Sequence, residues 1–248
     1  QDAYDAANNV IALKLYGLTD KYEDAWKGNN KEAILEFDYD AANGPNHLFD
    51  RYYVPQCDGY DNGSTGTPTQ EMVECYESKN GEKIDRSNSS QLAKGALPLK
   101  YGMDPDMKDG QSGIDVVIYR YADVLLTLAE CINRNEGSPT TEAIGLVNRV
   151  RKRAGLSELD DAQTASGEAF NEAILLERGH EFYLEGLRRQ DLIRFGKYVE
   201  YANNRIDAIN KSEGRGYFNV HEGHNRFWIP QSFIDESKGA IKQNDYDR

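Results

Sequence analysis

The stretch ILLERGHEFYLEGLRRQDLIRFG, residues 174–196, contains three glutamates and four arginines among aromatic and aliphatic residues. A helix advances about 100° per residue, which places acidic and apolar side chains on one stripe of a helix predicted to begin near Ser166: Phe170, Ile174, Glu177, Glu181, Leu184 and Arg188. Carboxylates that share a stripe with apolar side chains are predicted to be partly buried. Buried charge is costly without a partner, so ion pairs are expected here.

Two interpretations of these glutamates stay open. A glycosidase needs two carboxylates roughly 5 to 9.5 Å apart across an open cleft. Glu177 and Glu181 lie one turn apart, about 6 Å along the helix axis, so their spacing permits such a pair. The hydrolase interpretation uses Glu177 with Glu181 or Glu185. The apolar stripe and the dense arginines favour the structural interpretation, a buried ion-pair network between this helix and the one after Gly186. Its predicted members are Glu177, Arg178, Glu181, Glu185, Arg188, Asp191 and Arg194.

Composition excludes several classes of protein. The chain has 248 residues and a net charge of −13, and an acidic surface repels phosphate backbones, so nucleic acid is not an expected partner. No apolar run approaches the roughly 18 residues that span a bilayer. The three cysteines, Cys57, Cys75 and Cys131, form no C-x-x-C pair, which argues against a disulfide scaffold and a structural zinc site.

The segment before the opening stretch predicts a helical hairpin. Apolar residues recur at helical spacing from Tyr121 to Ile132, and Gly137 ends that helix. Ser138 and Pro139 are predicted to open the next helix, whose apolar face consists of Ala143, Val147, Val150 and Ala154. The short link predicts an antiparallel pair, the unit of a tetratricopeptide array.

The rest of the chain mixes helices, short strands and long irregular stretches. Helices are predicted over 3–17 and 67–77, and short strands over 33–40 and 114–119. Residues 41–66 and 78–113 are rich in Gly, Pro, Asn and Asp and are predicted as irregular loops. Trp26 and Trp228 are interpreted as core residues. The predicted fold class is therefore mostly α, of the α+β type, in a single domain over 1–248.

The first irregular loop is the best candidate binding site. It concentrates aromatic residues, namely Phe49, Tyr52, Tyr53 and Tyr60, among amides and charges such as Asn46. Sugar recognition uses a flat ring against the apolar face of a pyranose, with planar amides and charges on its hydroxyls. The alternative is that the tyrosines only pin the loop to the domain.

Two short motifs resemble metal sites but fit none. HEGH, residues 221–224, is one residue shorter than the zincin spacing and lies among glycines. DPDMKDG, residues 104–110, begins like a calcium loop but lacks the third ligand and closing glutamate in their required places. No nucleophile motif or phosphate-binding glycine loop occurs. We therefore expect no metal, no cofactor and no catalytic residue.

Six segments in order resemble the SusD/RagB family of outer-membrane nutrient-binding proteins. They are PTQEMVECYE (68–77), YRYADVLLTLAECINRNEG (119–137), AIGLVNRVRKRAGL (143–156), ILLERGHEFYLEGLRRQDLIRFGKY (174–198), FWIP (227–230) and QNDY (243–246). The family also has an N-terminal helical half preceded by a lipoprotein signal and an anchoring cysteine. These are absent here, so the chain is expected to correspond to the C-terminal half.

The resemblance implies a non-enzymatic role. Family members sit on the cell surface as outer-membrane lipoproteins, bind oligosaccharides or in some cases peptides, and deliver them to a SusC-like TonB-dependent transporter. For the glutamates of the opening stretch, it implies a structural role. Three alternatives remain open from the residues: a peptide-binding member, a glycoside hydrolase using Glu177 with Glu181 or Glu185, and a helical-repeat interaction module without a small ligand.

Overall fold

The computed structural model describes residues 1–47, 76, 100–102, 104–107 and 111–244. The chain divides into two compact units, Gln1–Glu181 and Phe182–Arg248, and each is described by itself. The helix predicted over 67–77 and most of the two predicted loops, 41–66 and 78–113, lie outside the described residues.

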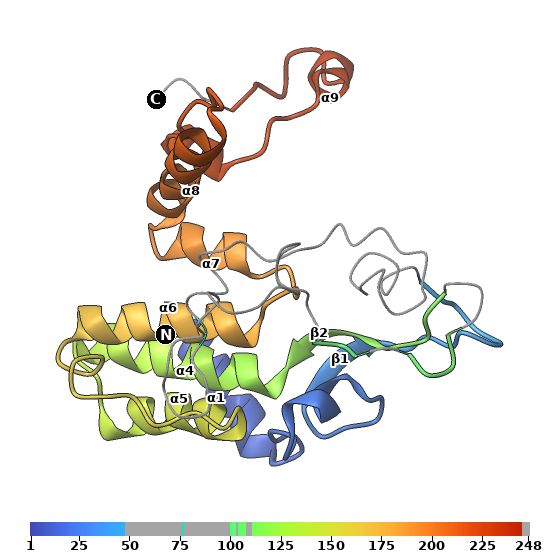
Figure 1. The fold of residues 1–248 in the computed structure, drawn as a ribbon, viewed down its shortest axis with the longest axis vertical. Helices are drawn as coiled ribbons and strands as arrows, with labels where there is room; N and C mark the ends of the chain where they lie inside the picture. Colours follow the sequence, from blue (N-terminus) through green and yellow to red (C-terminus); the bar gives the residue numbers. More distant parts are fainter. Residues whose placement is uncertain (48–75, 77–99, 103, 108–110, 245–248) are drawn as a thin grey trace. The chain divides into compact units, whose positions relative to one another are not determined.

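The first unit is a bundle of helices with α4 at its centre. Its α-helices are α1 (Asp2–Leu13), α4 (Tyr121–Glu136), α5 (Thr141–Arg153) and α6 (Gly167–Glu181). Helix α4 packs against α1, α5 and α6 (Figure 1). The predicted mostly helical fold class is confirmed. No helix in the described ranges is long and apolar enough to cross a membrane.

The hairpin of α4 and α5 forms the core as its apolar spacing predicts. Tyr121 and Ile132 mark the ends of a fully buried α4 face, and Gly137 ends this helix in the left-handed conformation at φ 71°. The next helix begins two residues later than Ser138 and Pro139 indicate. Thr140 is its N-cap, because its hydroxyl oxygen accepts a hydrogen bond from the backbone N–H of Ala143 at 3.1 Å.

A two-stranded antiparallel sheet stands beside these helices. Strand β1 (Ala33–Phe37) pairs with β2 (Val116–Arg120), and β2 runs directly into α4. On one side, Val117 packs with Ala25 and Trp26 of the 3-10 helix η1 (Tyr22–Trp26). Trp26 is therefore a core residue, as expected.

Helix α6 begins and ends through side-chain hydrogen bonds. The Ser166 hydroxyl accepts from the backbone N–H of Ala169, as an N-cap does. The helix stops at Glu181, so the predicted stripe does not continue through Leu184 to Arg188 on the same helix. Leu184 and Gly186 both take positive φ angles, 65° and 79°. The carbonyl of Glu181 accepts side-chain donors instead of a following backbone N–H.

The second unit contains α7 (Arg188–Arg194), α8 (Tyr198–Glu213), the 3-10 helix η4 (Glu222–Asn225) and α9 (Gln231–Glu236). Side-chain amides fasten its irregular segments. Asn203 both donates to and accepts from the backbone of Val220, and Asn210 does the same for Tyr217.

The FWIP segment of this unit is held in a similar way. Gln243 exchanges hydrogen bonds with the backbone of Ile229, and Asn244 donates to Phe227. The indole of Trp228 is 65% exposed, so its interpretation as a core residue is wrong. Hydrogen bonds to the backbone of Phe227 and Ile229 hold this segment in place, so the Trp228 ring need not be buried.

Candidate functional site

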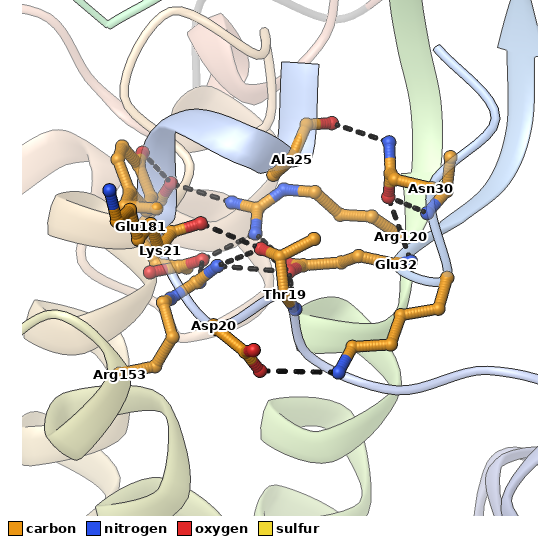
Figure 2. A network of polar contacts seen from close by, with 12 residues as sticks. Thr19, Asp20, Lys21, Ala25, Asn30, Glu32, Arg120, Arg153 and Glu181 are labelled. Carbon is orange, nitrogen blue, oxygen red and sulfur yellow. Dashed lines mark hydrogen bonds and ion pairs between the residues drawn. The ribbon is translucent and has the colours of Figure 1, made fainter. Parts of the chain in front are cut away.

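Four charged side chains from four elements meet at the end of α6. Glu181 is the last residue of α6 and Arg153 the last of α5, while Arg120 ends β2 and Glu32 precedes β1. Arg120 and Arg153 each donate to both carboxylates, at 2.8 and 2.9 Å to Glu32. All four side chains are at most 3% exposed. We call these four residues the charge cluster; Figure 2 shows its alternating acids and bases.

Neutral donors complete the hydrogen bonding of the charge cluster. The backbone N–H and the hydroxyl of Thr19 both donate to Glu32, each at 2.9 Å (Figure 2). The main-chain carbonyl of Glu181 accepts from the Tyr22 hydroxyl and the Lys100 amine, both at 2.9 Å, and from Arg120 at 2.7 Å. Cationic groups at the C-terminal end of a helix also offset its dipole. The cluster therefore fastens the segment before β1 to strand β2 and to helices α5 and α6.

The charge cluster lowers the pKa of Glu181. Burial alone would raise the pKa of the Glu181 carboxyl, but the positive charges of Arg120 and Arg153 outweigh burial, so the pKa lies below its usual value. A general acid must hold a proton near neutral pH, which requires a raised pKa. The lowered pKa favours the ionised form of Glu181, which is the opposite of what a general acid needs.

Glu177, which lies one turn before Glu181 on α6, is also paired inside the first unit. Glu177 is 2% exposed and accepts from Arg151 of α5 at 3.0 Å, and Arg151 also donates to the Ser157 carbonyl. Arg178 of the same helix pairs with Asp123 of α4 at 2.7 Å. These partners lie 26 and 55 residues away in sequence, so local spacing does not indicate them.

The remaining members of the predicted network belong to the second unit. Asp191 is buried and accepts from Arg194 one turn later, at 2.9 Å. The Arg188 guanidinium lies over the ring of Tyr201, 5.5 Å from its centroid. The backbone N–H of Glu185 donates to the carbonyl of Phe182 in the turn that follows α6.

This geometry does not resemble a hydrolytic site. A glycosidase places its two carboxylates on an open cleft, where one of them faces a sugar. Glu177 and Glu181 are instead buried, and arginine side chains occupy their oxygens. Arranged in this way, the carboxylates cross-link helices.

Of the predicted sugar-binding residues, the structure describes Asn46 alone. Asn46 is exposed and precedes His47, whose backbone pairs with that of Ser112. Phe49, Tyr52, Tyr53 and Tyr60 lie outside the described residues.

In both metal-like motifs, side chains accept hydrogen bonds from backbone N–H groups. In HEGH, His221 accepts through Nδ1 from the N–H of Gly223, and His224 accepts through Nδ1 from the N–H of His221, which forms a reciprocal cap of η4. In DPDMKDG, the two carboxylate oxygens of Asp104 accept from the N–H groups of Asp106 and Gly113.

A group of acids that sequence reasoning missed lies at one end of the sheet. Ligand oxygens of Glu36, Asp38 and Asp115 lie within 4.8 Å of one another, close enough to surround a cation. We call these three residues the acidic trio. The only signal in the sequence is the alternation of acids in EFDYD, residues 36–40. Asp115 joins them through strand pairing, which sequence spacing does not reveal.

The fold is mostly helical, and Glu177 and Glu181, the two carboxylates considered as a catalytic pair, are buried and paired with arginines. A sequence profile of the SusD family matches residues 95–246, and the chain belongs to this family. The starch-binding protein SusD of Bacteroides thetaiotaomicron is 32% identical over 149 residues, which cover 60% of this chain and 23% of that protein. SusD-like protein P38 of Formosa agariphila is 36% identical over 107 residues, covering 41% and 20%.

Solved structures match over almost the whole chain. Surface glycan-binding protein A from Bacteroides thetaiotaomicron superposes with a TM-score of 0.73 at 25% identity, covering 98% of this chain and 58% of that one. The same protein in complex with laminarihexaose gives 0.71 at 24% identity, covering 97% and 58%. The chain thus spans less than two thirds of these relatives. The resemblance predicted from the six segments is confirmed.

Proposed function

We propose that this chain is part of a cell-surface protein that binds an oligosaccharide and delivers it to a SusC-like TonB-dependent transporter. Membership of the SusD family carries the proposal. Relatives named as starch-binding and surface glycan-binding proteins support the ligand class. Attachment to the outer membrane through an N-terminal lipid anchor of the whole protein is part of the same proposal.

The proposed sugar contacts are the rings of Phe49, Tyr52, Tyr53 and Tyr60, with Asn46 beside them. Exposed rings stack on the apolar faces of sugars, and an amide offers both donors and acceptors to hydroxyl groups. Asn46 is exposed, as a ligand contact requires. Long irregular loops on a rigid scaffold often carry binding residues.

Calorimetry against a panel of oligosaccharides tests this proposal. The panel includes maltooligosaccharides and laminarihexaose, the ligand of a solved relative. Replacing Tyr52, Tyr53 and Tyr60 together by alanine should weaken binding by on the order of 1 kcal/mol per stacked ring. Tyr217→Ala, on an exposed ring of the second unit, is the matched control and should bind like the parent. Equal binding by the triple variant would place the site elsewhere.

We further propose that the protein performs no hydrolysis. The buried ion pairs of Glu177 and Glu181 support this, because neither carboxylate is available to a substrate. The parent should not turn over chromogenic glycosides or unlabelled oligosaccharides. Turnover that disappears in Glu177→Gln, while the fold persists, would establish the hydrolase alternative instead.

A peptide ligand is the second candidate, favoured by the net charge of −13, which would attract basic peptides. The same calorimetry with basic peptides separates the two ligand classes. Heat from peptides that depends on the three tyrosines, with none from sugars, would assign the site to peptides.

A further inference from the structure

The C-terminal end of α6 receives two side chains from a part of the chain that lies far before it in sequence. The last four carbonyls of a helix have no partner within the helix and are open to other donors. The Tyr76 hydroxyl donates to the His180 carbonyl at 3.0 Å, and its ring lies against the imidazole, with centroids 4.6 Å apart. The Lys100 amine donates to the next carbonyl, that of Glu181, at 2.9 Å. The two contacts therefore meet at adjacent carbonyls of one helix end.

Aromatic rings hold the Lys100 amine from several sides. The amine lies over the indole of Trp26, 4.7 Å from the ring centroid. It also lies 5.6 Å from the ring centroid of Tyr22 and 5.9 Å from that of Tyr101. Aromatic faces attract a cation, so the position of Lys100 is set by its charge as well as by its hydrogen bond.

The end of α6 is itself fastened by the charge cluster. The Glu181 carboxylate pairs with Arg120 and Arg153, and the Glu181 carbonyl also accepts from Tyr22 and Arg120. These partners come from three other elements, β2, α5 and η1. The acceptors of Tyr76 and Lys100 are therefore held in place by packed elements of the first unit.

A third residue fastens the chain before Tyr76. The backbone of His47 pairs with that of Ser112, at 3.1 and 2.8 Å, and His47 Nε2 donates to the Ile114 carbonyl at 2.7 Å. We call His47, Tyr76 and Lys100 the anchor residues. In sequence, the three tyrosines proposed as sugar contacts lie between the first two of them.

Anchors of this kind lower the cost of binding a ligand. The entropy lost when a loop is ordered grows with the length of chain between fixed points. The three anchor residues limit that length to residues 48–75 or 77–99. A binding segment that is already restrained loses less entropy when the ligand binds, so its affinity is higher.

We propose that the end of α6 anchors the stretch that carries the proposed sugar contacts, and that Tyr76 and Lys100 are positioning residues for oligosaccharide binding. Their role rests on the proposed function, because it requires a bound sugar. It also connects the buried charges to function, since the ion pairs of Glu181 fix the helix end to which both residues bind.

Limited digestion with trypsin tests the anchors without any sugar. Loss of a hydrogen bond from a charged donor makes local opening roughly tenfold more frequent. The double variant Tyr76→Phe with Lys100→Met should therefore be cleaved about tenfold faster within 77–99, where lysine or arginine stands at 79, 83, 86 and 94. Cleavage after Lys211, in α8, is the internal control and should keep the rate of the parent. Equal rates within 77–99 for the parent and the variant would overturn the proposal.

Calorimetry with the oligosaccharide panel tests the positioning role. The double variant should bind at least about tenfold more weakly than the parent. The loss should appear in the entropy of binding while the enthalpy stays close to that of the parent, because the same contacts form on a less restrained segment. A lower global stability would not change these quantities while the fold persists, and thermal melting checks that it does.

Conservative and exposed replacements are the controls. Lys100→Arg keeps a cation that can donate and stack on the rings, so it should bind like the parent. Lys31→Met breaks an exposed ion pair with Asp20, and Tyr217→Phe changes an exposed ring. Both should bind the sugar like the parent and should be cleaved at its rate.

Two results would contradict the positioning role. Undiminished affinity of the double variant, together with faster cleavage, would mean that Tyr76 and Lys100 hold the chain without positioning the ligand. A weaker affinity that comes from the enthalpy would mean that one of these side chains contacts the sugar itself. A parent that binds no sugar, beside a double variant that is cleaved faster, would refute the proposed function and leave the anchors at α6 supported.

Discussion

Glu32 lies just before strand β1 and Glu36 lies near the end of that strand, yet their surroundings are opposite. Glu32 is fully buried and contacts two arginines and Thr19. Glu36 has two other acids beside it and no ion pair within the described residues. The same residue type on one short segment therefore serves as a structural cross-link in one place and as an unneutralised charge in the other.

The difference teaches that neighbouring elements, and not local sequence, decide what a carboxylate does. Arg120 lies at the N-terminus of α4 and Arg153 at the C-terminus of α5, and both form ion pairs with Glu32. At the other end of the sheet, pairing brings Asp115 to Glu36 instead. We therefore expect substitutions in the charge cluster to destabilise the fold, and substitutions in the acidic trio to have small effects.

The largest expected effect comes from Arg120→Ala. This change removes one of the two arginines that pair with Glu32 and Glu181 in the charge cluster, and removal of one partner of a buried pair costs about 3 to 5 kcal/mol. Urea unfolding followed by circular dichroism measures the loss. Arg215→Ala breaks an exposed pair with Glu213 and should cost below about 1 kcal/mol. Similar losses in the free energy of unfolding for the two variants would mean that the buried charge cluster stabilises the fold no more than an exposed ion pair does.

A double-mutant cycle on Arg151 and Glu177 tests whether a second buried ion pair on α6 also stabilises the fold. This pair is as buried as the charge cluster but has fewer members. Each single replacement, Arg151→Met or Glu177→Gln, should destabilise the fold, and the double replacement should cost less than their sum. We expect a coupling of about 1 to 3 kcal/mol from equilibrium unfolding. Additive effects would show that the two side chains do not interact in solution.

Much of the fold follows from periodic patterns in the sequence. The apolar spacing of Tyr121 to Ile132 predicts α4. Gly137 is predicted to end this helix, and it does so in the left-handed conformation that glycine adopts readily. The end of α6 could not be predicted in this way. Its apolar stripe continues past Glu181, and the helix stops because Tyr22, Lys100 and Arg120, all distant in sequence, take the last carbonyl.

The site was harder to predict than the fold. Burial of Glu177 and Glu181 follows from the helical stripe, because both share it with Phe170 and Ile174. Their arginine partners come from β2 and α5, and only the packing of the helices reveals them. No local sequence pattern indicates that Glu32 is buried, because its arginine partners lie 88 and 121 residues away. The sugar-binding role of Tyr52, Tyr53 and Tyr60 stays a prediction.

A smaller loss of stability is expected from a substitution at Gly28, where the backbone lies close to Asp115 of the acidic trio. A Cβ at Gly28 would lie 2.3 Å from Oδ2 of Asp115, so Gly28→Ala must displace that carboxylate. Displacement also weakens the hydrogen bond that Asp115 accepts from the N–H of Tyr39, and we expect a loss of about 1 kcal/mol.

Gly145→Ala is the matched control for this change. Nothing lies within 4 Å of a Cβ at Gly145, inside α5, so the replacement should stabilise the fold by about 0.5 to 1 kcal/mol. Urea midpoints of the two variants should therefore move in opposite directions. A shift of the same sign in both would show that Asp115 moves away freely.

The smallest expected effect has the opposite sign to the first. Burial raises the pKa of the Glu36 carboxyl, and the charges of Asp115 and Asp38 raise it further. A carboxyl whose pKa is raised by folding stabilises the fold below its unfolded pKa, and this contribution is lost as pH rises through the folded pKa. Glu181 behaves in the opposite way, because its lowered pKa gives stability that is lost as pH falls.

Glu36→Gln keeps the acceptor for the Asn29 backbone but removes the charge. Near pH 7, we expect the variant to be more stable than the parent by on the order of 0.5 kcal/mol, the size of like-charge contacts between strands. The gain should shrink as pH falls below the unfolded pKa of about 4.3, where Glu36 is protonated in both states. Urea midpoints across this pH range measure it, with Glu213→Gln on an exposed acid as control. A Glu36→Gln variant that is less stable than the parent near neutral pH would mean that a favourable contact already neutralises Glu36, and the contrast with Glu32 would fail.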